Sequence, residues 1–334
     1  MKTSLPWESA GWLDSALPWL DAALASHGLR RAAAPDLFHT RPWSAVARIA
    51  LRGGGTVYFK AAAPVLAHEA ALTAALAAWY PRDVPPVLAA DPARAWLLLG
   101  DCGRPLRSYF PDGEGLALLE KACARFGQMQ VELSARLAEL ERLGAYDRRL
   151  AGLPGQVEDL LDDADALMIG QPDGLSAEQA AAARRLLPRY RALCAELAAT
   201  AIPASLHHDD LHDGNFFVED GQVRITDWGE TALAQPFNSL LITLRAASDR
   251  LDCAEDDPRL LRVRDAYLEA WSAGWSRADL RRAFALAWVT AMPARALTWR
   301  RVIRALGPGR GADYAAAVPG WVGEWLGEME KWGD

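Results

Sequence analysis

The sequence predicts an α+β protein with two lobes, a small β-rich lobe over residues 1–101 and a larger helical lobe over residues 102–334. Short runs between positions 45 and 101 alternate apolar and polar side chains, which is typical of strands. From Glu114 onward the apolar residues recur mostly at the spacing of helices. A chain of 334 residues has room for two domains of the usual size, roughly 150 residues.

The elements of the first lobe follow from these patterns in order. Residues 9–27 form an amphipathic helix pattern. The runs at 45–51 and 56–60 flank "RGGG", whose glycines adopt positive φ easily, so this segment is predicted to be a hairpin. A helix is expected at 65–78, and two short strands fit "PVLAAD" and "AWLLLGD".

The second lobe is predicted to be mostly helical, with one β island. The island consists of "NFFVE" and "QVRITDW", joined by Asp220-Gly221, a strong signal for a two-residue hairpin turn. The expected helices cover residues 114–143, 155–168, 177–200, 237–251, 258–274, 277–305 and 319–331.

Composition excludes several classes of protein. A net charge of −7 provides no global field for nucleic acid. The chain contains no run of about 18 apolar residues, so no membrane span is expected. No signal peptide is evident at the N-terminus. The four cysteines lack CxxC spacing, which fits a reducing compartment. We therefore expect a cytoplasmic protein that binds neither nucleic acid nor membrane.

The stretch "HHDDLHDGN", residues 207–215, is the densest group of polar residues in the chain. A metal centre, as in a metal-dependent phosphohydrolase, would need several of its histidines to face one point. The adjacent His207 and His208 point to opposite sides of an extended chain, and the histidines outside this stretch all lie in the N-terminal third. The metal centre is therefore the less favoured of the two interpretations.

A catalytic loop is the favoured interpretation, because the spacing matches the kinase pattern H-R-D-L-x-x-x-N. His208, Asp210, Leu211 and Asn215 fall in register with that pattern. Three further signals occur in the order that kinases have. They are Lys60 at the end of the strand "VYFK", Glu69 nine residues later in the following helix, and Asp227 in "DWG".

Two departures separate the chain from protein kinases. No G-x-G-x-x-G precedes the "VYFK" strand, and no A-P-E segment follows "DWG". These departures, together with the motif "H-x-D-L-H-x-G-N … D-W", resemble the aminoglycoside phosphotransferase-like (choline kinase-like) family of small-molecule kinases. The resemblance covers residues 35–330. The segments "TRPWSAVARI" and "QPFNSLL" resemble a bacterial subgroup without a settled substrate.

This resemblance implies a protein-kinase-like two-lobed fold and a set of residue roles. Asp210 would accept the proton of the acceptor hydroxyl, and Lys60, held by Glu69, would contact the phosphates of ATP. Asn215 and Asp227 would provide oxygen ligands for Mg²⁺, with two ions expected. Asp209 stands where the family commonly has glycine, so its side chain is expected away from the phosphates or on the acceptor side.

Three further residues are candidates for nucleotide contacts. Ser44 is expected at the tip of the nucleotide loop, with a plain turn serine as an equally supported alternative. Leu99 and Asp101 lie at the expected hinge, where backbone groups would meet adenine. The apolar run before Asp101 also fits a buried strand, which is compatible with that use.

The acceptor site is the least determined feature. Its expected walls are an acidic helix at 155–168 and the helical region at 265–305. The first carries Glu158, Asp159, Asp162, Asp163 and Asp165, and the second carries Trp271, Trp275, Trp288 and Trp299. These walls would suit a cationic acceptor. The acidic run also fits a solvated face, and the basic stretch 294–310 fits either a solvated face or a site for an anionic acceptor.

Taken together, the sequence predicts an ATP- and Mg²⁺-dependent O-phosphotransferase that acts on a hydroxyl of a small molecule, with an aminoglycoside or amino sugar as the family default. The alternative is an ATP-binding pseudokinase-like regulatory module, which the intact set of Lys60, Asp210, Asn215 and Asp227 disfavours. The acceptor, the choice between ATP and GTP and the oligomeric state stay open.

Overall fold

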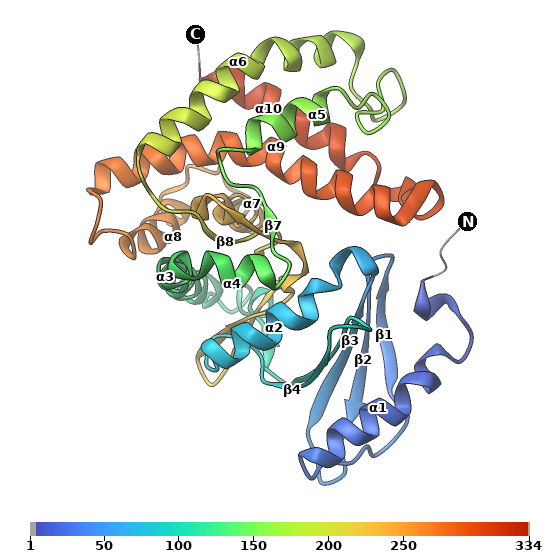
Figure 1. Ribbon diagram of the computed structural model, residues 1–334. Helices are drawn as coiled ribbons and strands as arrows, with labels where there is room; N and C mark the ends of the chain where they lie inside the picture. Colours follow the sequence, from blue (N-terminus) through green and yellow to red (C-terminus); the bar gives the residue numbers. More distant parts are fainter. Residues whose placement is uncertain (1–4, 333–334) are drawn as a thin grey trace. The chain divides into compact units, whose positions relative to one another are not determined.

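The computed structural model describes residues 5–332 and divides into two compact units (Figure 1). The first unit takes the chain up to Leu106 together with Gly214–Gly229, and the second takes Arg107–Asp213 and the chain from Glu230 on. The boundary predicted from the sequence instead lies after residue 101, with residues 214–229 in the second lobe. A β-rich first unit and a helical second unit confirm the predicted α+β fold class.

A five-stranded antiparallel sheet of order β1-β2-β3-β5-β4 forms the centre of the first unit. Gly53, Gly54 and Gly55 connect β2 to β3 with φ between 88° and 100°, as the "RGGG" signal predicts. The exposed edge strand β1 was not predicted, because all six of its residues are exposed and no alternation marks it. The bounds are β1 (Asp36–Arg41), β2 (Ser44–Ala50), β3 (Thr56–Ala62), β4 (Val87–Asp91) and β5 (Trp96–Gly100).

Helix α1 (Trp12–Ser26) packs its apolar side against this sheet. Trp12 and Leu20 lie in the same buried cluster as Phe59 of β3, and the rings of Trp12 and Phe59 stack with centroids 5.8 Å apart. Helix α2 (His68–Trp79) packs against β4. It begins three residues later than the sequence suggested, after a short 3₁₀ turn at Pro64–Leu66.

A second, three-stranded sheet of order β10-β9-β6 completes the first unit. Strands β9 (Phe216–Glu219) and β10 (Gln222–Ile225) form the predicted hairpin, whose turn residues Asp220 and Gly221 have φ of 49° and 72°. Strand β6 (Arg104–Pro105) pairs with β9. This pairing joins residues far apart in the sequence and places the hairpin in the first unit.

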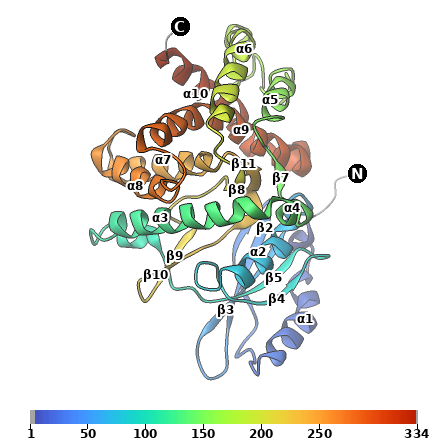
Figure 2. The ribbon, with the colours of Figure 1, turned by 60° about the vertical axis from the view of Figure 1, so that its left-hand side comes forward.

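The second unit consists mainly of helices, and α3 packs against α8 (Figure 2). The predicted helix at 114–143 is divided in two at Ser134–Arg136, and the one at 155–168 ends at Leu161. Helix α9 is broken at Gly307, where φ is 76°. The bounds are α3 (Gly115–Leu133), α4 (Leu137–Arg142), α5 (Leu153–Leu161), α6 (Ala177–Ala199), α7 (Leu240–Leu251), α8 (Pro258–Glu269), α9 (Arg277–Arg310) and α10 (Ala317–Lys331).

A small sheet of order β7-β11-β8 lies within the helical unit and positions the "HHDDLHDGN" loop. Its strands are β7 (Tyr146–Asp147), β8 (Ser205–His208) and β11 (Thr231–Ala234). Gln130 of α3 supports β8 through a hydrogen bond of 2.8 Å from its Nε2 to the carbonyl of Leu206. The loop therefore begins at the end of a strand that is held on both sides. Among the described helices, none is both long and apolar enough to cross a lipid bilayer.

Candidate active site

Lys60, Glu69 and Asp227 meet in the first unit. Nζ of Lys60, on β3, donates to Oε1 of Glu69 over 2.6 Å and to Oδ1 of Asp227 over 2.7 Å. Lys60 and Glu69 are buried, whereas the Asp227 side chain keeps 44% of its surface exposed. The structure thus brings together three of the residues that the sequence singled out.

The charged side chains of Lys60, Glu69 and Asp227 are buried to different extents. Burial alone would lower the pKa of Lys60, but the charges of Asp227 and Glu69 raise it above its ordinary value, so Lys60 stays protonated. Burial raises the pKa of Glu69 to about 7, with the charge of Asp227 adding to the rise and Lys60 opposing it. Asp227 has φ of 63°, in the left-handed region, which a non-glycine residue occupies at a cost of roughly 1 kcal/mol. Such outliers persist where the surroundings hold them and cluster at functional sites.

Asn215 lies at the open end of the β9–β10 hairpin, next to Asp227. The backbone N–H of Thr226 donates to the Asn215 carbonyl over 2.9 Å, so the residue before Asp227 is fixed to Asn215. One carboxylate and one amide thus come from neighbouring strand ends. Hard oxygen donors of this kind fit Mg²⁺, which prefers few protein ligands and keeps several waters.

The remaining nucleotide candidates also lie in the first unit. Ser44 begins β2 directly after the β1–β2 turn and is buried, two positions from Val46, which pairs with Lys60. Leu99 lies on β5, and Asp101 follows that strand and is exposed. The Asp101 carboxylate accepts a hydrogen bond from the backbone of Gly103 over 3.0 Å, so this side chain forms a local turn.

Asp210, in the second unit, has the contacts expected of an oriented carboxylate. Its Oδ1 accepts a hydrogen bond of 3.0 Å from Nη2 of Arg295, and Nε2 of His212 lies 3.5 Å from its Oδ2. Burial raises the pKa of Asp210, but the hydrogen bond from His212 and the charge of Arg295 outweigh burial and lower it below its ordinary value. Asp210 still exposes 29% of its side chain.

Arg295, on α9, is the residue that sequence reasoning missed. Its guanidinium is buried and forms ion pairs with Glu230, with Asp210 and, at 3.6 Å, with Asp209. Burial raises the pKa of Glu230 to about 7, although the charge of Arg295 opposes this rise. The basic stretch 294–310 was the available signal, but nothing in it distinguished this arginine from its neighbours.

Asp209 is a buried structural partner of the loop. Its Oδ1 lies 3.0 Å from Nε2 of His207, whose Nδ1 is 2.9 Å from Oγ of Ser239. Burial would raise the pKa of Asp209, but Arg295 and His207 lower it to about 2. Both ring nitrogens of His207 are therefore engaged within the protein. Among residues 5–332, no group of three or more His, Cys, Asp or Glu side chains is arranged to hold a metal ion.

The expected acidic wall differs from the structure, because arginines already pair with its carboxylates. Glu158 pairs with Arg191 of α6, and Asp162, which follows α5, pairs with Arg184. Asp163 lies beyond the end of α5. It pairs with Arg304 and lies 3.6 Å from Arg300, both on α9. Three of the five carboxylates of this run, Glu158, Asp162 and Asp163, thus have arginine partners.

The expected aromatic wall is also only partly available. Trp271 is buried against Phe237 and belongs to the core. Trp275 is partly buried and donates its indole N–H to the carbonyl of Thr200 over 2.8 Å. Trp299 stacks on Tyr314 with centroids 6.1 Å apart. The assumption that these tryptophans all line an acceptor site was therefore wrong for Trp271.

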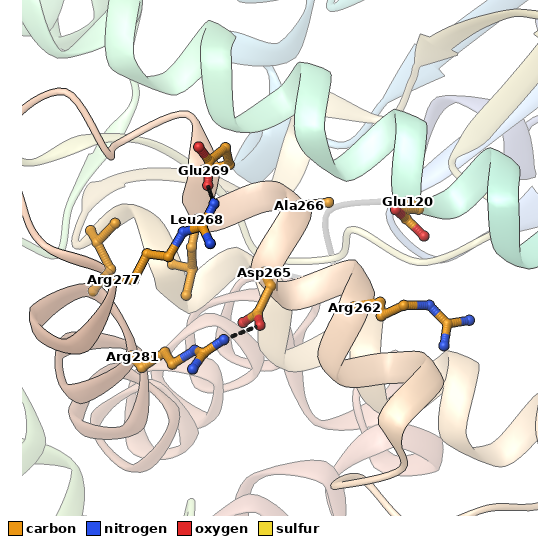
Figure 3. Close-up of a pocket in the computed structure, with 9 residues that line it drawn as sticks. Glu120, Arg262, Asp265, Ala266, Leu268, Glu269, Arg277 and Arg281 are labelled. Atoms are coloured by element: carbon orange, nitrogen blue, oxygen red, sulfur yellow. Dashed lines mark hydrogen bonds and ion pairs between the residues drawn. The ribbon is translucent and has the colours of Figure 1, made fainter.

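Two cavities in the described part of the second unit are lined by several arginines. One, of about 340 Å³, lies between α3, α8 and the start of α9 (Figure 3), where Arg281 pairs with Asp265 and Arg277 with Glu269. No residue of the 207–215 loop lines it.

The second cavity, of about 610 Å³, is lined by His212 and Asp213 of the loop. Arg250 of α7 pairs with Asp213, and Arg245 pairs with Glu324. The arginine charges of these two cavities thus largely have carboxylate partners already.

The two groups of residues lie in a chain whose fold is similar to the protein-kinase-like fold of solved structures. A choline/ethanolamine kinase family protein from Mesorhizobium loti is 15% identical, with a TM-score of 0.60 over 95% of each chain. The GDP and kanamycin complex of APH(2″)-IIia is 12% identical, with a TM-score of 0.58 over 95% of this chain and 99% of that one.

A macrolide 2′-phosphotransferase from Brachybacterium faecium is 19% identical, with a TM-score of 0.56 over 91% of this chain and 97% of that one. No protein-family model and no curated sequence matches the chain. At these identities the likeness establishes the fold. It confirms at that level the resemblance to aminoglycoside phosphotransferase and choline kinase-like proteins.

Proposed function

We propose that this protein is a phosphotransferase that moves the γ-phosphoryl group of ATP to a hydroxyl of a small molecule. The observation that carries the proposal is the Lys60–Glu69–Asp227 group, in which a buried, protonated lysine is held by two carboxylates at 2.6 and 2.7 Å. A buried cation held in this way is suited to bind phosphate oxygens. The neighbours of this fold carry kinase and phosphotransferase names, which supports the same reaction class.

The residues of each unit have separate roles in this proposal. Lys60 binds phosphate oxygens of the nucleotide, and Glu69 fixes the lysine. Asn215 and Asp227 would hold Mg²⁺, which neutralises charge on the phosphates when bound. Asp210 accepts a hydrogen bond from the acceptor hydroxyl and orients its oxygen. The bond from that oxygen to the γ-phosphorus forms, the bond from the γ-phosphorus to ADP breaks, and the hydroxyl proton passes to Asp210.

The low pKa of Asp210 suits this role in a loose transition state. In such a transition state the phosphorus–oxygen bond to ADP has largely broken before the hydroxyl oxygen donates much electron density to phosphorus. The orientation of the hydroxyl by Asp210 therefore contributes more to the rate than the basicity of Asp210. An ionised Asp210 at neutral pH is the form that accepts the hydrogen bond, and the hydrogen bond from His212 and the charge of Arg295 keep it ionised.

The test is a screen for Mg²⁺-dependent release of ADP with kanamycin, a macrolide, choline, ethanolamine and neutral sugars as acceptors. Asp210→Ala is expected to abolish release while ATP binding, measured by calorimetry, stays within about twofold of the parent, because the loop residue does not bind the nucleotide in this proposal. Asp112→Ala, at an exposed turn residue, is the matched control. ATP binding without turnover on any acceptor would instead favour the regulatory module.

A further inference from the structure

The imidazole of His212 lies between Asp210 and an open cavity. The backbone N–H of His212 donates to the carbonyl of Asp210 over 2.9 Å, which holds the two residues side by side. Nε2 of the ring lies 3.5 Å from Oδ2 of Asp210. The same ring lines the cavity of about 610 Å³, and 27% of the side chain is exposed. Solvent therefore reaches the ring, and burial alone does not determine which of its nitrogens carries the proton.

Arg107 contacts the other nitrogen of this ring. Its Nη2 lies 3.2 Å from Nδ1 of His212. A guanidinium has N–H donors and no acceptor, so this contact is a hydrogen bond only if Nδ1 carries no proton. A neutral ring then carries its proton on Nε2, the nitrogen that faces Asp210. Arg107 thus favours the tautomer in which His212 donates to the carboxylate.

The other states of the ring fit this geometry less well. A proton on Nδ1, in the second neutral tautomer or in the imidazolium, would set N–H against N–H at the contact with Arg107. In the second tautomer the Nε2 lone pair would also face the carboxylate of Asp210. Asp213 compensates little for these contacts, because its Oδ1 lies 4.0 Å from Nδ1 and its carboxylate pairs with Arg250.

Arg107 is itself fixed to the 207–215 loop. Its backbone N–H donates to the carbonyl of Asp213 over 3.0 Å, and its Nε lies 3.6 Å from Oδ1 of the same residue. The Asp213 side chain is buried and also pairs with Arg250 of α7. Removal of the Arg107 guanidinium therefore leaves this carboxylate with a cation, so Arg107 can be substituted without isolating a buried charge.

The two oxygens of Asp210 have different partners. Nη2 of Arg295 donates to Oδ1 over 3.0 Å, and the Nε2–H of His212 faces Oδ2. Hydrogen bonds at catalytic sites are often long before the substrate binds and shorten in the complex. A ring nitrogen that already carries a proton cannot accept one from Asp210. His212 in this tautomer therefore holds the carboxylate and does not relay its proton.

We propose that Arg107 fixes His212 as its Nε2–H tautomer, and that His212 in this form positions Asp210 for the acceptor hydroxyl. This inference rests on the proposed function and adds two positioning residues to it. Each acts through Asp210: Arg107 selects the tautomer, and His212 fixes the orientation of the carboxylate. A carboxylate whose two oxygens are both held presents a fixed direction to the hydroxyl, which is the main contribution required of it in phosphoryl transfer.

The first experiment determines the tautomer of His212 without any substrate. Nuclear magnetic resonance of the ring nitrogens is measured at mildly alkaline pH, where free imidazole is neutral. The chain has six histidines, and the signal that is lost in His212→Gln assigns this ring. The parent is expected to carry the proton on Nε2 and none on Nδ1.

Arg107→Met is expected to raise the share of rings with a proton on Nδ1 about threefold or more, because the donor to Nδ1 is lost. Arg107→Lys keeps a donor and is expected to raise this share less. Arg282→Met is the control, because Arg282 is an exposed arginine of α9 that pairs with Glu196. It should leave the His212 signals unchanged.

The second experiment separates the two ring positions by substitution. The amide nitrogen of glutamine can take the position of Nε2, whereas that of asparagine can take only the position of Nδ1. With an acceptor that the ADP-release screen identifies, His212→Asn is expected to lower kcat about tenfold or more, because a donor to a charged group is lost. His212→Gln keeps a donor to Asp210 and is expected to lose less. KM for ATP should stay within about twofold in both variants, and thermal melting verifies that both fold.

The outcomes separate the two proposals. A tautomer of His212 that depends on Arg107, with no turnover of any acceptor, would overturn the phosphotransferase and support the hydrogen-bonded chain from Arg107 to Asp210. A proton on Nδ1 in the parent, or a share that Arg107→Met leaves unchanged, would overturn the role of Arg107 whatever the activity. Turnover with equal losses of kcat in His212→Gln and His212→Asn would overturn the positioning of Asp210 by Nε2–H and keep the phosphotransferase.

Discussion

Nη2 of Arg295 donates to Oδ1 of Asp210 over 3.0 Å, from a position 85 residues further along the chain. The same buried guanidinium also pairs with Asp209 and Glu230. One cation thus fixes three carboxylates around the candidate catalytic residue. We infer that Arg295 acts on the reaction through Asp210, as a positioning residue.

Arg295→Lys is expected to lower kcat about tenfold or more while KM for ATP stays within about twofold, because lysine lacks the planar fork that reaches several carboxylates. Weaker interaction with Asp210 lets the pKa of that carboxyl rise, so the acidic limb of the pH–rate profile moves to higher pH. Arg282→Lys, on the exposed side of the same helix, is the control. A variant with the parent's kcat and pH profile would reduce Arg295 to a structural residue.

The Lys60–Glu69 pair can be tested by a double-variant cycle. Lys60→Met removes the cation and leaves Glu69 buried without it, which is expected to lower the free energy of unfolding by about 3 kcal/mol. Adding Glu69→Gln is expected to recover about 1–2 kcal/mol of this loss, because the unpaired charge is gone. Urea unfolding measures both changes, and ADP release should stay absent in both variants.

The matched control for this cycle is Arg48→Gln, which breaks the exposed pair of Arg48 and Asp36 on the same sheet. It is expected to change stability by less than about 1 kcal/mol. Additive effects of the Lys60 and Glu69 substitutions would show that the two side chains do not interact as the 2.6 Å contact indicates.

Asp227→Asn is expected to weaken binding of Mg²⁺–ATP more than binding of ATP without Mg²⁺, because an anionic ligand of the ion is lost. Some loss in both conditions should occur, since Asp227 also holds Lys60. Asp220→Asn, in the turn of the same hairpin, is the control, because asparagine tolerates the positive φ found there. Calorimetry in both conditions decides, and equal losses would make Asp227 a partner of Lys60 alone.

Glu230 is expected to make stability depend on pH near neutrality. Its pKa is about 7 in the folded protein against an ordinary value of 4.5. Between these values the folded state holds a proton that the unfolded state has released, so stability falls as pH rises through this window. The full effect is on the order of 3 kcal/mol.

Glu230→Gln cannot titrate, so its free energy of unfolding should fall less than the parent's between pH 4.5 and 8. A smaller slope is expected to remain, because the pKa of Glu69 is also raised. Urea unfolding at several pH values measures the slopes. Glu139→Gln, which alters a partly exposed pair with Arg136, should keep the parent's slope. An unchanged slope in Glu230→Gln would contradict the prediction.

The sequence predicted the elements whose pattern is local. The hairpin at Asp220-Gly221 and the spacing of Lys60, Glu69 and Asp227 are examples, because turn chemistry and motif order can be read along the chain. Strands β7, β8 and β11 have four residues or fewer, too few to show an alternation, and their pairing depends on distant segments.

The ion-pair partners of charged side chains could not be predicted from the sequence either. Nothing local indicates that Arg191 pairs with Glu158 or that Arg295 reaches Asp210, since each pair joins different elements. The arginine partners of the carboxylates at 155–168 could not be predicted from the sequence, for a physical reason. Net charge within a segment does not determine the field at a site once side chains from other helices are added.

The first unit is discontinuous in sequence, because it needs the β9–β10 hairpin at residues 214–229. Lys60 and Asp227 are 167 residues apart, so the buried lysine acquires its second carboxylate only after most of the chain has been synthesised. During translation the N-terminal sheet must persist without that pair while the intervening helices emerge. A fragment that stops near residue 106 would contain Lys60 and Glu69 but neither Asn215 nor Asp227. Expression of the candidate nucleotide-binding residues as a separate module therefore requires a fusion of the hairpin to the sheet rather than a truncation.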